Sequence, residues 1–109
     1  ALASVLLASC GTGTDLSATA AEGQRLAQEL GCTSCHTGQG GAGPDWEGVW
    51  GTTRELADGS TQVFDSTYVR SSLFDPSSQV VAGFQAIMPA FSLSESQVEA
   101  IIAFLEEAE

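Results

Sequence analysis

The segment Cys32-Thr33-Ser34-Cys35-His36 constrains this chain of 109 residues more than any other part of its sequence. It holds two of the three cysteines, and the second is followed at once by the chain's only histidine. Residues 37–44 are rich in glycine and end in Pro44, which predicts a loop without regular structure. Long loops in so small a domain usually surround something. We therefore expect a binding site around these thiols and this imidazole.

Four kinds of chemistry use a Cys-x-x-Cys pair. A thioredoxin-type redox pair lies where a strand meets a helix in a βαβ unit, and no parallel-strand pattern precedes Cys32. A structural zinc site needs four ligands, and beyond this segment only Cys10 offers a further thiolate or imidazole. A structural disulfide between Cys32 and Cys35 would leave His36 without a role. These three interpretations remain open, but the redox pair and the disulfide leave His36 unused, and a zinc site would need the distant Cys10 as its fourth ligand.

Covalent attachment of haem gives all three side chains a role. Two thiols on one helical turn can reach two neighbouring vinyl groups of the porphyrin, and the imidazole of the next residue then lies under the iron. We expect Cys32 and Cys35 to form thioethers with one haem c and His36 to be an axial iron ligand. The second ring nitrogen of His36 then needs an acceptor that fixes its tautomer.

Met88 is the only methionine and is followed by Pro89, whose fixed φ would stiffen a ligand loop. A lone methionine is more often a core residue. With no lysine and no second histidine in the chain, however, its thioether is the remaining common ligand for the sixth iron position. Histidine with thioether raises the reduction potential and closes both axial positions. We therefore expect an iron that exchanges only electrons.

The spacing of apolar and capping residues predicts short helices. Leu26 and Leu30 share one face of a helix over 21–30 that stops at Gly31. Asp65 is the expected N-cap of a helix over 66–74. Between them, Asp58-Gly59 lies between short runs that predict a hairpin within 54–64.

The C-terminal helix has the clearest signals. Ser94 and Gln97 form a capping box, and Leu93 and Val98 occupy the positions of a hydrophobic staple. An apolar stripe at helical spacing follows, made of Val98, Ile101, Ile102 and Leu105. We expect this face to be buried in an all-α domain.

Over roughly residues 20–109 the chain resembles a class I cytochrome c. The resemblance rests on "GCTSCH", "GPDWEGVWG", "IMPAF" and the C-terminal helix. It is closest to the cytochrome c domain fused to subunit II of some bacterial haem-copper oxygen reductases, which have counterparts of "RELADGSTQVFDSTYVRSSLFDPSSQVVAGF". The resemblance implies an all-α class I cytochrome c fold, in which three to five short helices and a small β-hairpin insertion surround one covalently bound haem.

The resemblance also implies roles for individual residues. The carbonyl of Pro44 would accept a hydrogen bond from the proximal histidine. Trp46 and Trp50 would either hydrogen-bond a haem propionate through the indole N–H or pack against the porphyrin. A glycine of the first helix would pack against an aromatic of the last, here Gly23 and Phe104. The expected haem-binding set is Cys32, Cys35, His36, Pro44, Trp46, Trp50 and Met88, with His36 and Met88 on the iron and Arg54 as a further candidate partner of the propionates.

Leu7-Ala8-Ser9-Cys10 resembles the lipobox at the end of a bacterial lipoprotein signal, in which the cysteine carries the lipid. We interpret residues 1–19 as a signal remnant and flexible tether and residues 20–109 as the cytochrome c domain. The alternative is a short apolar helix or strand packed on the domain. The lipobox predicts a lipid anchor on the periplasmic side of the bacterial cytoplasmic membrane.

The formal net charge is -11, with three arginines and no lysine. This composition argues against nucleic acid as a partner and against docking through a ring of lysines. An acidic surface steers the protein toward basic partner surfaces and affects the association rate more than the fold.

These features predict an electron-transfer protein rather than an enzyme. We expect a monomer that carries single electrons by outer-sphere transfer from a respiratory donor complex to a terminal oxidase. One alternative is a haem domain or subunit of a larger oxidase or dehydrogenase complex. Another is a haem enzyme or gas sensor with a labile methionine ligand.

Overall fold

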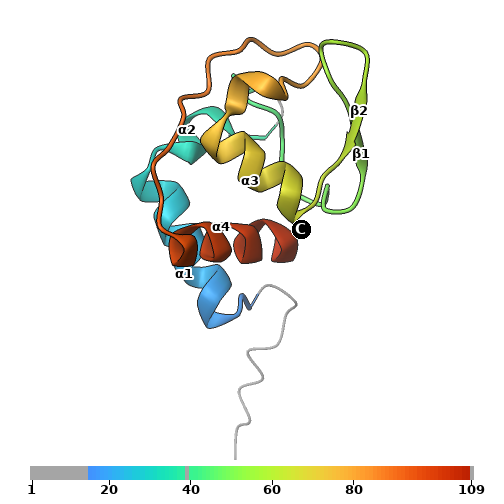
Figure 1. The fold of residues 1–109 in the computed structure, drawn as a ribbon. Coiled ribbons are helices and arrows are strands. Elements are labelled where there is room, and N and C mark those ends of the chain that lie inside the picture. Colours follow the sequence, from blue (N-terminus) through green and yellow to red (C-terminus); the bar gives the residue numbers. More distant parts are fainter. Residues whose placement is uncertain (1–14, 39, 109) are drawn as a thin grey trace, which may run out of the picture.

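The computed structural model describes residues 15–38 and 40–108. In these ranges four α-helices, one short 3₁₀-helix and one two-stranded sheet follow each other along the chain (Figure 1). They are α1 (Ala18–Glu29), α2 (Cys32–Cys35), β1 (Thr53–Glu55), β2 (Thr61–Val63), α3 (Ser66–Phe74), η1 (Pro76–Ser78) and α4 (Glu95–Glu107). This helix-rich arrangement with a small hairpin is compatible with the expected cytochrome c fold. The lipobox lies outside the described residues.

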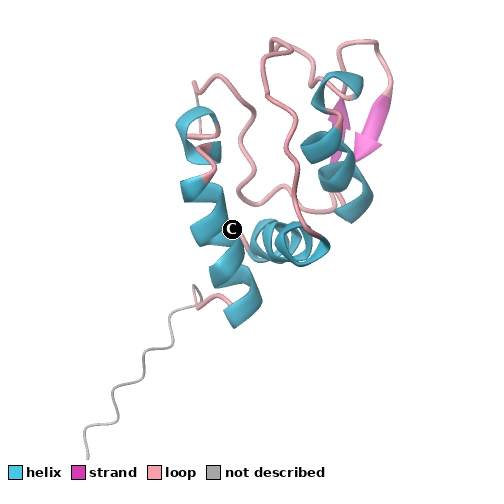
Figure 2. Cartoon of the chain, turned by 60° about the vertical axis from the view of Figure 1, so that its left-hand side comes forward, coloured by secondary structure: helices cyan, strands magenta, loops and turns pink. Residues whose placement is uncertain are grey.

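The centre of the fold is the crossing of α1 and α4, which Figure 2 shows side by side. Gly23 makes the close approach possible, because a Cβ at this position would lie 1.9 Å from the carbonyl oxygen of Ala100 and 2.9 Å from Cβ of Phe104. The expected contact between Gly23 and Phe104 is therefore present. Ala20, Leu26 and α4 residues surround it in the buried core.

The ends of these two helices are tied together by polar contacts. The backbone N–H and the hydroxyl of Ser17 donate to the carboxylate of Glu107 at 2.8 and 2.7 Å. The Ser17 hydroxyl also accepts from the N–H of Ala20, which makes it the N-cap of α1. Helix α1 therefore begins three residues before the predicted start. The capping box of Ser94 and Gln97 starts α4 as predicted.

Helix α3 and the hairpin form the opposite side of the domain. Asp65 caps α3 by accepting from the N–H of Tyr68, and the helix ends at Phe74 before the Asp75-Pro76 step, as predicted. Strands β1 and β2 pair antiparallel with Arg54 opposite Gln62, and Asp58 accepts from Ser60 in the turn between them. The predicted hairpin is therefore confirmed.

The chain between η1 and α4 is fixed at two places. It pairs with the hairpin through an isolated bridge between Leu56 and Val81, and the N–H of Phe91 donates to the carbonyl of Leu73 at the end of α3. Met88 lies between these two attachments. Among the described residues, no helix has the length and apolar character needed to span a membrane.

Candidate functional site

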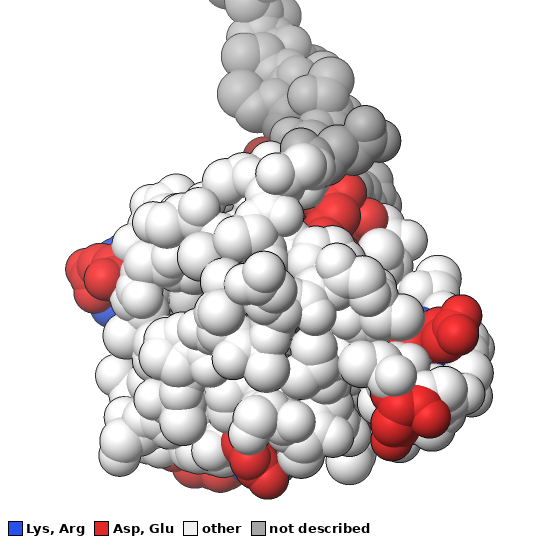
Figure 3. Space-filling model, turned by 90° about the horizontal axis from the view of Figure 1, so that it is seen from above, with Lys and Arg blue, Asp and Glu red and all other residues white. Residues whose placement is uncertain are grey.

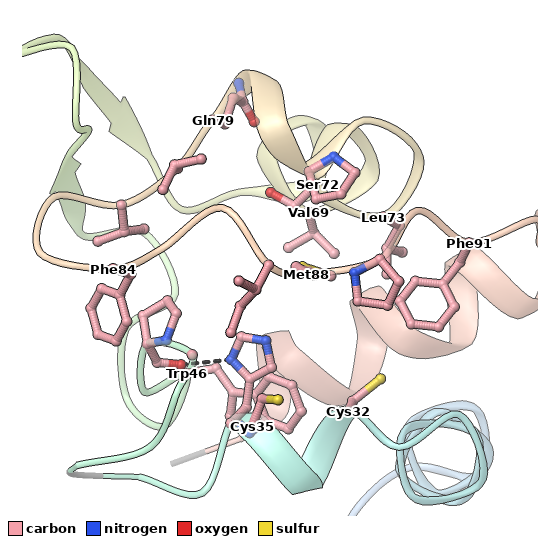
Figure 4. A pocket seen from close by; sticks show the side chains of 18 of the residues that line it. Cys32, Cys35, Trp46, Val69, Ser72, Leu73, Gln79, Phe84, Met88 and Phe91 are labelled. Carbon is pink, nitrogen blue, oxygen red and sulfur yellow. Dashed lines mark hydrogen bonds between the residues drawn. The ribbon is translucent and has the colours of Figure 1, made fainter.

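A cavity of about 290 Å³ lies between α2, α3, α4 and the segment 79–91, near the lower end of the usual size of cofactor pockets. Figure 4 shows Cys32 and Cys35 on one side, with Val69 and Leu73 of α3 and the Met88 segment across from them. Its wall is mostly apolar, and Arg54 is the only arginine, lysine, aspartate or glutamate among the described residues that line it. Such a site favours a large apolar ligand with few polar groups.

The short helix α2 carries the two cysteines of the site. Gly31 has a φ of 80°, which ends α1 and starts α2 in a new direction without the strain that a side chain would bring. The turn then presents Cys32, which is half-buried, and Cys35, which is exposed, along the cavity wall. Both thiols are free, so the structure does not contain the disulfide considered above.

The His36 imidazole is held in one orientation. Its Nδ1 lies 2.7 Å from the carbonyl oxygen of Pro44, the hydrogen bond drawn in Figure 4. Because a carbonyl can only accept, Nδ1 carries the proton and Nε2 keeps its lone pair for a metal ion. The acceptor that the resemblance implies is therefore in place. Among the described residues, no three His, Cys, Asp or Glu side chains gather into a metal site, and the zinc interpretation depends on Cys10, which lies outside them.

Met88 is half-buried and lines the same cavity. The Leu56–Val81 bridge holds its segment on one side and the hydrogen bond from Phe91 to Leu73 holds it on the other. The thioether therefore comes from a loop fixed at both ends, which limits the cost of presenting a ligand. Its neighbour Ile87 is 56% exposed, so the loop lies at the surface beside the cavity.

Arg54 and Gln79 supply two buried polar atoms without partners. Neither Nε of Arg54 nor Oε1 of Gln79 has a hydrogen-bond partner among the described residues. The guanidinium lies 5.0 Å from the centre of the Phe64 ring and donates to the carbonyl of Asp45. Buried polar groups are normally paired, and a guanidinium pairs best with a carboxylate. The Arg54 guanidinium therefore fits an apolar ligand that carries carboxylates, as haem does, whereas Oε1 of Gln79 accepts and needs a donor.

Burial shifts three titratable groups on the cavity wall. It raises the pKa of the Cys32 thiol and that of the Tyr68 phenol, so both remain protonated at neutral pH. It lowers the pKa of Arg54, although the negative charge of Asp45 opposes this shift. All three shifts disfavour the charged form, which is the effect of an environment with low polarity.

The family model described as cytochrome c oxidase, cbb3-type, subunit III matches residues 18–105. The chain belongs to this cytochrome c family. No curated protein matches the chain. The domain is thus an electron-transfer module of the kind that carries covalently bound c-type haem, and the donor set in the cavity fits that group. The family description names subunit III, which supports a class I cytochrome c, and the resemblance to subunit II stays a prediction.

In this cytochrome c domain the two tryptophans occupy different places. Trp46 lines the cavity and stacks on His36, with ring centres 4.7 Å apart and planes inclined by 16°. Trp50 does not line the cavity, because its ring packs edge-on against Phe64, which forms the wall there. The structure therefore brings together every predicted haem-binding residue except Trp50.

Sequence patterns did not predict that α3 of this cytochrome c domain forms one wall of the cavity. Tyr68, Val69, Ser72 and Leu73 all line the cavity, and their i, i+1, i+4, i+5 spacing marks one helical face. This spacing identifies the face but not the element that packs against it. The unpaired amide oxygen of Gln79 had no signal in the sequence either, because only the fold buries it.

Proposed function

We propose that this protein is a monohaem c-type cytochrome that carries single electrons by outer-sphere transfer in a bacterial respiratory chain, to a terminal oxidase. The observation that carries the proposal is the cavity in which Cys32, Cys35 and His36 on one turn face a segment with Met88. The family match to a protein of a cbb3-type oxidase supports the respiratory context.

A bound c-type haem supplies the redox chemistry, because its iron takes up and releases one electron. The residues of the chain hold it. Cys32 and Cys35 provide the thioether links, and His36 offers Nε2 because Pro44 binds the proton on Nδ1. Met88 supplies the sixth ligand from a loop that is fixed at both ends. Arg54 has an unpaired N–H donor from which a propionate could accept.

The protein around the site favours electron transfer over catalysis. His36 and Met88 would both ligate the iron of a bound haem, which would leave no open position for oxygen or a substrate. The apolar side chains of α3 and α4 offer water few hydrogen-bond partners around a bound haem. Fixed ligands and these apolar surroundings would keep the rearrangement that accompanies each electron small.

The surface charges define the partner chemistry. Arg25 pairs with Glu22 and Glu29, and Arg70 makes a bidentate pair with Glu95. Arg54 lies at the cavity, so none of the chain's three arginines is a free surface cation. In the face seen in Figure 3, acidic side chains lie around the margin and the middle is uncharged. We expect donor and acceptor to meet it with apolar patches bordered by basic residues.

The anchor belongs to the same proposal. Cys10 carries lipid, the segment between Cys10 and the Ser17 cap of α1 forms the tether, and the cytochrome domain works on the periplasmic side of the cytoplasmic membrane as a monomer. Two or three acyl chains hold a protein firmly, at about 0.8 kcal/mol per buried CH₂. A Cys10→Ser variant should therefore be released into the periplasmic fraction, whereas the wild type should need detergent. Release of the wild type by salt alone would contradict the anchor.

The main alternative is a haem-carrying subunit of a larger oxidase complex. The family description, which names a subunit, favours it. Purification of the wild type as part of a stable assembly would support this alternative, whereas a monomer in detergent would support the free carrier.

The test of the carrier function uses the reduced holoprotein, oxygen and membranes of the source bacterium. Rapid reoxidation that cyanide stops would support donation to a terminal oxidase, and slowing at high salt would show that the acidic surface guides docking. Slow reoxidation that cyanide does not affect would contradict it. Binding of carbon monoxide to the reduced protein at neutral pH would instead indicate an enzyme or sensor with an open axial position.

A further inference from the structure

The indole of Trp46 lies flat against the imidazole of His36. The ring centres are 4.7 Å apart and the planes are inclined by only 16°. The geometry points to Trp46 as a positioning residue that fixes the plane of the iron-binding imidazole in this protein. This inference rests on the proposed haem ligation by His36 and deepens it.

Two backbone contacts already restrict the His36 ring. The hydrogen bond from Nδ1 to Pro44 fixes one edge but leaves rotation about the axis of that bond. The backbone of Gly43 lies against the same ring, and only glycine leaves room for it, because a Cβ there would lie 2.8 Å from Cε1 and 2.9 Å from Nδ1. A parallel aromatic neighbour opposes the remaining rotation, because a tilt of the imidazole would drive ring atoms into the indole.

Trp46 is itself held by the crossing of α1 and α4. Its ring meets Phe104 edge-on, with the centres 5.9 Å apart and the planes at 84°. Phe104 is 8% exposed and packs at the point where Gly23 lets the two helices touch. The crossing of α1 and α4 therefore holds Phe104, Phe104 holds Trp46, and Trp46 holds the plane of the imidazole.

The backbone around Trp46 is fixed as well. The carbonyl of Asp45 accepts from Arg54, and the carboxylate of Asp45 accepts from the N–H of Glu47 at 3.0 Å. These bonds lie on either side of Trp46 in a loop that otherwise makes few hydrogen bonds. The indole is thus a fixed surface rather than a mobile cover. A smaller apolar residue would fill part of the space but would present no flat face to the ring.

The experiment compares four holoproteins labelled with ¹⁵N: wild type, Trp46→Phe, Trp46→Met and Trp50→Met. Phe and Met have similar volume, but only Phe keeps a flat ring. Trp50→Met is the matched control, because Trp50 packs on Phe64 and not on His36. NMR measures how fast the Nδ1 proton of His36 exchanges with D₂O, and the backbone amides of Ala100 and Ile101 report global opening. EPR g values of the oxidised proteins report the ligand plane.

In Trp46→Met the Nδ1 proton should exchange about two- to tenfold faster than in the wild type, which is the range that an aromatic pair contributes, while the α4 amides keep their rates. The EPR g values should shift in the same variant. Trp46→Phe and Trp50→Met should stay close to the wild type. Equal exchange and equal g values in all four proteins would overturn the role of Trp46 while leaving haem ligation intact.

The wild type alone provides a second test, which does not depend on the folding of any variant. Nuclear Overhauser contacts between the indole protons of Trp46 and the imidazole protons of His36 are expected, and their absence would overturn the inference. A wild type without covalent haem, or with haem that His36 does not ligate, would overturn the proposed function as well. The two failures are therefore distinguishable.

Discussion

The crossing of the helices and the loops around the cavity are built in different ways. Every buried residue of the described chain lies in α1, α3, α4, or at Leu56 and Phe64. No described residue between 28 and 55, or between 74 and 97, is buried. Yet these two stretches carry Cys32, Cys35, His36 and Met88. The helices bury side chains against each other, whereas the residues that would hold the haem have no core of their own.

This difference indicates which part of the fold depends on the cofactor. An apolar group in the cavity would cover Met88, Phe91 and Trp46 from the side that the protein leaves open. A domain of this size has little stability to spare. We therefore expect the haem to provide the apolar surface against which the loops pack. Without haem, the packing of the helices alone should not keep the domain folded.

The largest effect is expected from removal of an attachment residue. His36→Ala or Cys35→Ala should leave a largely unfolded product, because haem binding and folding are coupled when the ligand completes the core. Circular dichroism should show loss of the cooperative thermal transition, whereas Thr33→Ala on the exposed side of α2 should keep it. A cooperative transition in the haem-free protein would show that the helices are stable alone.

The next largest effect tests the helix crossing itself. Gly23→Val places a Cβ 1.9 Å from the carbonyl of Ala100, so α1 and α4 must separate. The free energy of unfolding should fall by about 3 kcal/mol, at the upper end of the usual cost of overpacking. Gln24→Ala on the exposed side of α1 is the matched control. Denaturant unfolding measures both, and an unchanged midpoint for Gly23→Val would mean that the crossing is looser than described.

A smaller loss of stability, with a large change in redox behaviour, is expected at the ligand loop. Met88→Ala should stay folded and lose less than about 2 kcal/mol, below the range for a buried methionine, because Met88 is only half-buried. Its reduction potential should fall and its sixth position should open to added ligands. Ser92→Ala, on the same segment but exposed and not part of the cavity wall, should keep the wild-type potential. An unchanged potential in Met88→Ala would remove this residue as the ligand.

The smallest effect concerns the contact between the helix ends. The hydrogen bonds from Ser17 lower the pKa of Glu107 below its ordinary value of 4.5. Because the pKa is lower in the folded state, this contact stabilises above pH 4.5 and is lost as the pH falls through the folded value.

Glu107→Gln should therefore lower Tm slightly at neutral pH and should lose less Tm than the wild type on acidification. Glu106→Gln is the control, because Glu106 hydrogen-bonds to none of the described residues. Parallel Tm curves for Glu107→Gln and the wild type would show that the contact contributes nothing in solution.

Local signals in the sequence predicted the elements well. Capping residues determined the starts of α3 and α4, because Asp65 and Ser94 satisfy backbone donors only a few residues away. The start of α1 was missed, since Ser17 lies in a run of small polar residues where several caps are equally good. In this case the carboxylate of Glu107, 90 residues away in the chain, decides the choice.

The types of side chain in the sequence were enough to predict which residues could bind haem. Cys32, Cys35 and His36 stand together in one motif, and Met88 is the only methionine of the chain, so motif and composition were enough to select them. The roles of Arg54 and Trp46 in the structure depend on tertiary geometry. Arg54 bonds to the backbone of Asp45, and Trp46 stacks on His36 across ten residues of loop. No spacing rule predicts either contact.

The contact between Ser17 and Glu107 also bears on how such a domain can be combined with other proteins. Both residues lie at the outer ends of the described helices, and neither lines the cavity. A chain that enters at Ser17 and leaves at Glu107 does so at almost one point. Such a domain can be inserted into a loop of a host protein or joined at either end without disturbing the cavity. Because its two ends lie together, this redox domain can be joined to different proteins as one unit.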